Sequence, residues 1–162
     1  MSGRELLVRV ADLRTGGPDD VLVTVGLGSC VAIMLHDAEA RVGGLAHVLL
    51  PSPALARPDN NPAKFPQSAV PRLLELMLAD GARPERVTGR LAGGASMFAA
   101  LAPAGTIQMG ERNLVAARHA LVSNGVRLIG EAVGGDFGRT VRLRVCDGTV
   151  EVRTVAHGIK HL

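Results

Sequence analysis

Residues 24–35 read TVGLGSCVAIML, a glycine-rich segment that leads to Cys30 and continues directly into an apolar run. A second apolar run, residues 43–51, follows after a short polar turn and contains His47. Two such runs joined by a turn predict a β-hairpin. Cys30 begins one strand and His47 lies late in the other, so antiparallel pairing can bring the thiol and the imidazole together. A thiol beside an imidazole is the minimum arrangement for an activated sulfur nucleophile.

The glycines of this segment predict an unusual backbone next to the thiol. Gly26 and Gly28 permit a positive φ and let other groups approach the main chain closely. Such a turn can direct the N–H groups of Ser29 and Cys30 to one point, which would form an oxyanion hole beside the sulfur. The alternative is a tight turn into a strand with an inert, packed cysteine, since free cysteine is among the most buried residue types.

Other nucleophiles and metal sites are less favoured by the sequence. Ser29 ranks below Cys30 because a hydroxyl needs a strong adjacent base, whereas a thiol is already partly ionised near neutral pH. Cys146 lies on a hairpin near the C-terminus with no histidine close in sequence, so a structural role is expected. The remaining histidines show no ligand spacing with the cysteines, so we expect neither a metal site nor a cofactor.

Composition excludes several classes of protein. The chain has 162 residues, one domain's length, with 47% hydrophobic and 20% charged residues. A net charge of +3 and only three aromatic residues, all Phe, do not indicate a nucleic-acid-binding protein. No apolar run is long enough to span a membrane, and the N-terminus lacks the apolar core of a signal peptide. Two cysteines without an export signal favour a reducing, cytoplasmic location.

The periodicity predicts an α/β protein, a single-domain layered sandwich with a mixed, largely antiparallel sheet packed by helices. Helices are expected from Ser68 to Gly81 and from about Glu111 to Asn124, since each segment carries an apolar face and a stop signal. Domain 1–162 is expected to be one unit, with 1–19 and 156–162 peripheral and 51–66 a flap near the site. Strands are expected at 5–10, 21–25, 31–35, 43–51, 86–92, 126–133 and in a final hairpin at 141–152.

Taken together, six segments resemble the chemoreceptor glutamine deamidase (CheD) family of bacterial and archaeal chemotaxis. They appear in family order and cover the chain from about residue 20 to the final strands. The resemblance implies a layered α/β sandwich similar to the catalytic domain of cytotoxic necrotizing factor toxins. The segments are 24–31, 43–47, 50–51, 93–98, 110–113 and 134–139.

The resemblance also implies a reaction, the hydrolysis of glutamine side chains on the cytoplasmic helical domain of chemoreceptors. Cys30 would attack the amide carbon and form a thioester, and His47 would move the protons. The family places a threonine six residues before the cysteine to complete the triad, which here is Thr24. Groups near Gly28 and Ser29 would hold the oxyanion, and an imidazolium beside the thiol would lower the Cys30 pKa.

Several alternatives stay open at this point. On its own, Thr24 is an ordinary β-strand residue. The family also binds CheC-type chemotaxis phosphatases, so the chain could act mainly by docking to such a partner. A different Cys–His amidohydrolase or acyl-transfer enzyme, such as a protease or a transglutaminase-like protein, is the other possibility. The roles of the Gly93-Gly94 and Gly134-Gly135 pairs and of Asn113 are likewise open.

Overall fold

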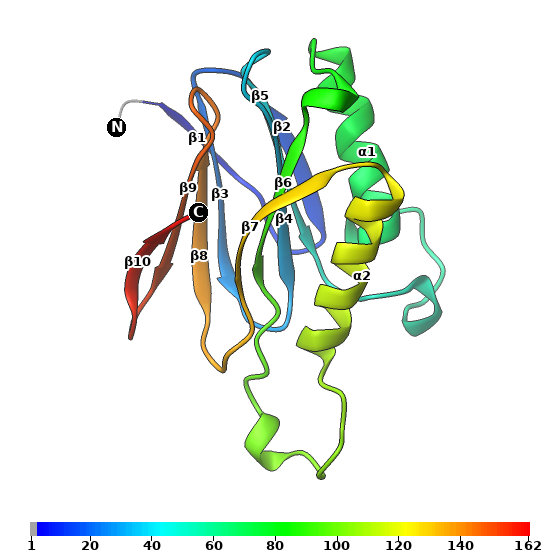
Figure 1. Cartoon of the computed structure of the whole chain (residues 1–162). Coiled ribbons are helices and arrows are strands. Elements are labelled where there is room, and N and C mark those ends of the chain that lie inside the picture. The colour runs from blue at the N-terminus through cyan, green and yellow to red at the C-terminus, as the bar shows by residue number, and fades with distance from the viewer. Residues whose placement is uncertain (1–2) are drawn as a thin grey trace.

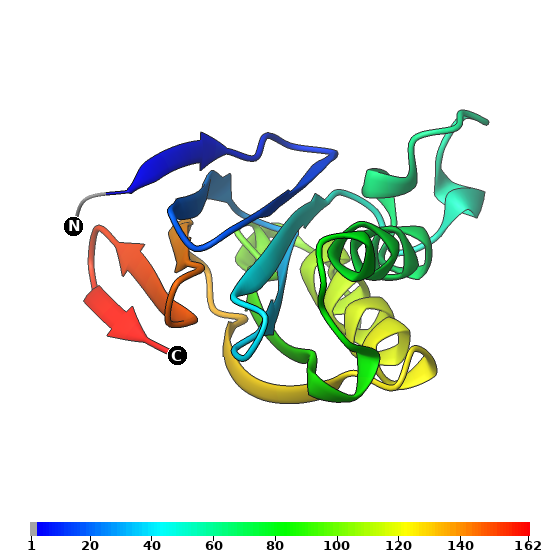
Figure 2. The same cartoon turned by 90° about the horizontal axis from the view of Figure 1, so that it is seen from above.

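Two five-stranded sheets pack face to face, and two helices cover the outer face of one of them (Figure 1 and Figure 2). The computed structural model describes residues 3–162. The helices are α1 (Pro66–Ala79) and α2 (Met109–Ser123). The first sheet has the order β1 (Arg4–Leu7), β3 (Asp20–Leu27), β8 (Arg139–Arg144), β9 (Thr149–Thr154) and β10 (Gly158–His161). The second has the order β2 (Asp12–Gly16), β5 (Val42–Val48), β4 (Val31–Asp37), β6 (Thr88–Gly93) and β7 (Arg127–Val133).

The predicted fold class is confirmed, and the structure adds that the strands divide between two sheets. Only β1–β3 and β6–β7 pair in parallel, and every other neighbouring pair is antiparallel. The expected hairpin of residues 31–35 and 43–51 forms as β4 and β5. The expected C-terminal hairpin forms as β8 and β9.

Strand β4 is buried on both faces, which explains its continuous apolar sequence. Val31, Ile33 and Leu35 point to the core between the second sheet and the helices. Ala32 and Met34 point to the core between the two sheets. The same alternation continues on β5, where Leu45 belongs to the core between the sheets. Side chains on this face of β4 and β5 therefore lie in the middle of the sandwich.

The predictions for the two ends of the chain were incomplete. Residues 12–16 read DLRTG and carry too little apolar character to predict a strand, yet they pair with β5 as β2. Residues 158–161 were expected to be peripheral without a regular structure, but they pair with β9 as an exposed edge strand. In both cases a neighbouring strand supplies the hydrogen-bond partners that the local sequence does not predict.

The helices agree with the prediction to within a few residues. Helix α1 begins at Pro66, and its N-cap position is Phe65 rather than Ser68. The Ser68 hydroxyl donates instead to the carbonyl of Pro62 at 2.7 Å. No helix formed by residues 3–162 has both the length and the apolar character needed to cross a lipid bilayer.

Candidate active site

The β4–β5 register places Cys30 and His47 on one face of the second sheet. Val31 pairs with Val48, and Ala32 pairs with His47. Cys30 precedes Ala32 by two residues and packs against the same core between the sheets. Side chains two residues apart share a face, so Cys30 is the diagonal neighbour of His47 across the strand pair.

Thr24 reaches the same point from the opposite sheet. It lies on β3 and is fully buried, as is His47. The Thr24 hydroxyl oxygen lies 2.7 Å from Nδ1 of His47 and 2.6 Å from the carbonyl oxygen of Val8. The sequence did not point to Val8, because a main-chain carbonyl leaves no signal in the residue type.

These two contacts define the tautomer of the histidine. A carbonyl oxygen only accepts, so the single hydroxyl proton of Thr24 goes to Val8. The Thr24 oxygen must then accept, and Nδ1 of His47 is the donor. In a neutral imidazole the other nitrogen, Nε2, consequently carries a lone pair and no proton.

The Nε2 atom of His47 is buried and has no hydrogen-bond partner within residues 3–162. Burial lowers the pKa of His47 from 6.5 to about 4, so the imidazole is neutral at neutral pH. An unpaired buried acceptor is costly and is characteristic of a site that awaits a ligand or a transferred proton. The arrangement therefore leaves a free base on the sheet face that also carries Cys30.

The expected lowering of the Cys30 pKa was wrong for the resting protein. Burial raises the pKa of this thiol, although the Cys30 backbone N–H, hydrogen-bonded to the sulfur, acts in the opposite direction. No imidazolium stabilises a thiolate here, because the desolvation that keeps Cys30 protonated also keeps His47 neutral. The resting pair is therefore a thiol and a neutral base.

The segment between β3 and β4 is held by its carbonyl groups. The N–H of Ala95 donates to the Gly28 carbonyl at 2.8 Å, and the N–H of Gly94 donates to the Cys30 carbonyl at 2.9 Å. Among the hydrogen bonds of residues 3–162, none uses the N–H of Ser29, and the N–H of Cys30 binds only the sulfur of its own residue. The Ser29 donor is therefore free, and the Cys30 donor lies against the sulfur, where the oxyanion hypothesis places a donor.

The Gly93-Gly94 pair serves backbone geometry in this structure. Gly93 has φ +102°, and a Cβ atom there would lie 2.4 Å from the Cys30 carbonyl oxygen. Gly26 also has a positive φ, +70°, inside the irregular part of the β3–β8 pairing. Gly28, by contrast, does not adopt a positive φ. The close approach at Gly93 is what lets residue 94 bind the Cys30 carbonyl.

The remaining candidate residues lie outside this cluster. His36 is buried and its Nε2 binds the Val145 carbonyl at 2.8 Å, which is a structural contact. Cys146 is a free cysteine in the turn after β8. Ser29 is half-buried and makes no side-chain hydrogen bond in the described chain. No group of His, Cys, Asp or Glu side chains within residues 3–162 is arranged to hold a metal ion.

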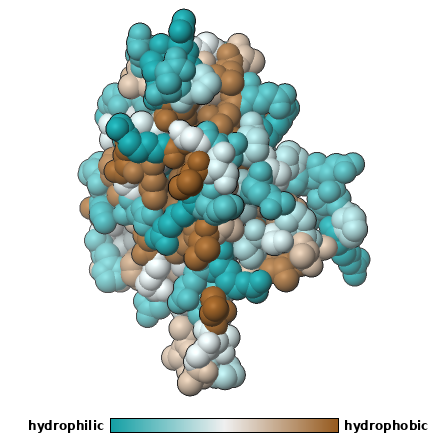
Figure 3. Space-filling view, turned by 45° about the vertical axis from the view of Figure 1, so that its right-hand side comes forward, coloured by the Kyte–Doolittle hydropathy of each residue, from teal (hydrophilic) through white to brown (hydrophobic). Residues whose placement is uncertain are grey.

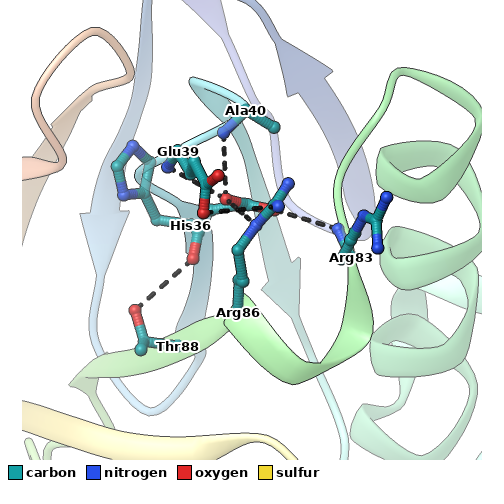
Figure 4. A network of polar contacts seen from close by, with 7 residues as sticks. His36, Glu39, Ala40, Arg83, Arg86 and Thr88 are labelled. Atoms are coloured by element: carbon teal, nitrogen blue, oxygen red, sulfur yellow. Dashed lines mark hydrogen bonds and ion pairs between the residues drawn. The ribbon is translucent and has the colours of Figure 1, made fainter.

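A second polar network lies at the other end of β4 and closes the hairpin (Figure 4). The fully buried Asp37 carboxylate accepts from the backbone N–H groups of Glu39, Ala40 and Arg83. It also accepts from the Arg86 guanidinium at 3.0 Å, and these contacts lower the Asp37 pKa despite burial. Asp37 is the last residue of β4 and Cys30 directly precedes the first, so this network supports the hairpin rather than the site.

An exposed apolar segment adjoins the Cys30 segment. It comprises residues 96–108 and projects from the molecule at the bottom of Figure 1, and Figure 3 shows brown, hydrophobic atoms at the base of this projection and paler ones at its tip. A Cβ atom on Gly28 would lie 3.6 Å from the side chain of Met97, so the Met97 side chain lies next to the Cys30 segment. The exposed apolar side chains of this segment are Met97, Phe98, Leu101 and Ile107.

Fold and site together define a two-sheet α/β sandwich with a Thr–His pair across the sandwich and a cysteine beside it. Residues 49–154 match the family model described as CheD chemotactic sensory transduction. The match begins two residues after His47, but the relatives described next cover the chain essentially from end to end. This chain belongs to the CheD family.

Three curated relatives are close in length and sequence. A protein of Caldanaerobacter subterraneus subsp. tengcongensis is 38% identical over 100% of both chains. A Clostridium novyi protein is 40% identical over 99% of both, and a Geobacter metallireducens protein is 42% identical over 96% of both. The first two are named "Probable chemoreceptor glutamine deamidase CheD", and the third has the same name with the number 2.

A solved structure supports the fold alone. The crystal structure of a Neisseria meningitidis protein of the DUF152 family superimposes with a TM-score of 0.56 and 10% sequence identity. The match covers 83% of this chain and 65% of the other, so this chain spans just under two thirds of that protein.

Proposed function

We propose that this chain is a chemoreceptor glutamine deamidase, which hydrolyses glutamine side chains of receptor proteins to glutamate and ammonia. The relatives' names support the reaction class. The observation that carries the mechanism is the unpaired Nε2 of His47, held as an acceptor by Thr24 on the same face as Cys30. We propose residues 1–162 as one catalytic domain acting in the cytoplasm, where the helical domain of receptors lies.

The first half of the reaction forms a thioester. The Cys30 sulfur bonds to the side-chain amide carbon while Nε2 of His47 accepts the thiol proton. A neutral pair suits this step, because the proton leaves the sulfur as the new bond forms. His47, now an imidazolium, then donates that proton to the departing nitrogen, the C–N bond breaks and ammonia leaves. The thioester carbonyl remains on Cys30.

The second half consumes water. Nε2 of His47 removes a proton from a water molecule, which attacks the thioester carbon. The C–S bond breaks, the sulfur takes the proton back from His47, and glutamate is released. In both halves negative charge develops on the carbonyl oxygen. The N–H groups of Ser29 and Cys30, beside Gly28, are the proposed donors to it.

The exposed apolar segment 96–108 suits the substrate proposed here. An amphipathic receptor helix carries an apolar face that can contact a partner, with polar side chains such as glutamine beside it. Contact with Met97, Phe98, Leu101 and Ile107 would bring such a helix next to Cys30. The same surface favours the second candidate function, docking to a protein partner such as a CheC-type phosphatase.

The decisive experiment is peptide mass spectrometry of a chemoreceptor cytoplasmic domain after incubation with the protein. We expect amide-to-acid mass gains at defined glutamines, with the receptor chain length unchanged. Cys30→Ala should abolish the gains. Cys146→Ala is the matched control and should leave them intact, because Cys146 lies on another part of the fold.

Each other outcome favours a different function. Cleaved or cross-linked receptor chains would identify a different Cys–His amidohydrolase. An absence of mass gains from every receptor tested, together with binding of a CheC-type phosphatase that survives Cys30→Ala, would support docking as the main role.

A further inference from the structure

Asn113 is a third buried polar side chain near Cys30, besides Thr24 and His47, and the proposed chemistry makes no use of it. It lies on α2, is fully buried and has no exposed atom. Its Nδ2 donates to the carbonyl of Ser29 at 2.9 Å and to the carbonyl of Leu49 at 3.2 Å. Its Oδ1 has no hydrogen-bond partner within residues 3–162. Asn113 therefore binds its surroundings only as a donor, through the two hydrogens of Nδ2.

The two acceptors belong to the two strands that carry Cys30 and His47. Ser29 directly precedes Cys30, and Leu49 follows His47 by two residues. The β4–β5 pairing has Val31 and Val48 as its last pair, so no ladder bond joins the strands beyond them at this end. The Asn113 amide spans the gap in place of a ladder bond.

We propose that Asn113 is a positioning residue that sets the distance between the Cys30 sulfur and Nε2 of His47. Its amide links Ser29, which precedes Cys30, to Leu49, which follows His47, from the helix side of the sheet. This inference rests on the proposed deamidase function for its meaning in catalysis. Its geometric content, a Cys30–His47 spacing that depends on Asn113, can be measured without a receptor.

The surrounding packing keeps α2 close enough for this contact. A Cβ on Gly110 would lie 2.4 Å from the Ala95 carbonyl oxygen, and one on Gly94 would lie 2.4 Å from Leu114. These glycines permit the first turns of α2 to lie directly against residues 94–95. Three consecutive carbonyls, of residues 28–30, are consequently held by Ala95, Asn113 and Gly94.

The test uses Asn113→Ala with Asn124→Ala as the matched control. Asn124 is the C-cap of the same helix, eleven residues or about 16 Å from Asn113, and donates through Nδ2 to the Ala120 carbonyl at 2.7 Å. We expect Asn113→Ala to lower kcat for receptor deamidation roughly 10- to 100-fold with KM unchanged, because small displacements of reacting groups have effects of this size. Asn124→Ala should leave kcat unchanged.

A second readout separates positioning from general loss of structure. The rate of Cys30 alkylation by iodoacetamide is measured at pH 7 in four proteins: wild type, Asn113→Ala, His47→Ala and the double variant. Positioning through His47 requires that Asn113→Ala slows alkylation when His47 is present and has no further effect in the His47→Ala background. Equal effects in both backgrounds, or no effect at all, would overturn the inference.

Two further outcomes are covered by the design. Should Asn113→Ala not fold, Asn113→Asp keeps the side-chain volume, lacks both donors and is expected to show the same coupling to His47. Should wild-type protein deamidate no receptor while the alkylation coupling is found, the deamidase proposal fails and the positioning role stands. If wild type deamidates a receptor and Asn113→Ala does so at the same rate, the positioning role is overturned and the deamidase proposal stands.

Discussion

The most informative contact at the residue scale is the hydrogen bond from Nδ1 of His47 to Thr24. A threonine hydroxyl is a weaker acceptor than a carboxylate, so it stabilises an imidazolium less. The role we propose for it is orientation: the Val8 carbonyl takes the Thr24 proton and leaves the hydroxyl able only to accept from the imidazole. This chain of two hydrogen bonds leaves Nε2 free of a proton.

Thr24→Val should therefore lower kcat for deamidation by about 10²-fold, in the range of a lost positioning and proton-transfer contact. Valine has the same shape but no hydroxyl, so it no longer holds the Nδ1–H tautomer. Thr24→Ser keeps the hydroxyl and should retain most of the rate. Steady-state kinetics of ammonia release compares the two variants, and equal rates for valine and serine would contradict the orienting role.

The stability of the protein should depend on pH through His47. Its pKa is about 4 in the folded protein and 6.5 ordinarily, so the unfolded chain binds more protons between these values. The contribution of neutral His47 to the free energy of unfolding is then fully present above about pH 6.5. It is lost as the pH falls toward 4, which lowers the free energy of unfolding by on the order of 2–3 kcal/mol. Urea unfolding from pH 4 to 7 measures this change. His47→Gln removes the titrating group, so a variant with an unchanged slope would contradict the assignment to His47.

At the scale of elements, the β3–β4 connection is shaped by groups that belong to other segments. Residues 28–30 have no regular structure of their own. Their carbonyls are held by residues 94–95 and by α2, which follow them by more than sixty positions. The proposed nucleophile, Cys30, is thus placed by the β6–α2 region, and the backbone of Gly93 lies close against its carbonyl.

Gly93→Ala should be strongly destabilising, with Gly105→Ala as the control. Both glycines have a positive φ, but a Cβ on Gly93 meets the Cys30 carbonyl oxygen at 2.4 Å while one on Gly105 meets open space. We expect a loss of about 1 kcal/mol at Gly105 and about 3 kcal/mol or more at Gly93, where overpacking adds to the strain. Chemical denaturation measures both. Similar losses would show that the close contact at Gly93 is relieved elsewhere.

At the scale of the whole molecule, the site exists only where the two sheets meet. Thr24 comes from the first sheet, and Cys30 and His47 come from the second. The core between the sheets therefore sets the geometry of the site, whereas the core under the helices supports it from behind. Figure 2 shows the two packed sheets and the helices beside them.

Two leucine truncations distinguish these cores. Leu22→Ala removes a fully buried side chain from the core between the sheets, two residues before Thr24 on the same face. Leu121→Ala removes one from the core under the helices. Each should lower the unfolding free energy by about 2–5 kcal/mol. At a temperature below the Tm of both variants, only Leu22→Ala should also lower kcat. Equal kcat values for the two variants would contradict control of the site by the packing of the sheets.

The sequence alone was sufficient to predict most of the elements and the family. The Cys30–His47 hairpin was predictable because β4 and β5 are adjacent in the chain and apolar throughout. The edge strands β2 and β10 were not, because their stability comes from the neighbouring strands and not from their own residues. The same applies to the division into two sheets, which depends on contacts between distant segments.

For the site, the sequence determined which residue types were present and that Cys30 and His47 share one side of a hairpin. Only the tertiary structure decided their chemical state. The Thr24–His47 bond crosses between sheets, the Val8 carbonyl that defines the tautomer is a main-chain group, and Asn113 arrives from a distant helix. Burial reversed the predicted direction of the Cys30 pKa, because desolvation depends on the whole packed chain and local sequence carries no record of it.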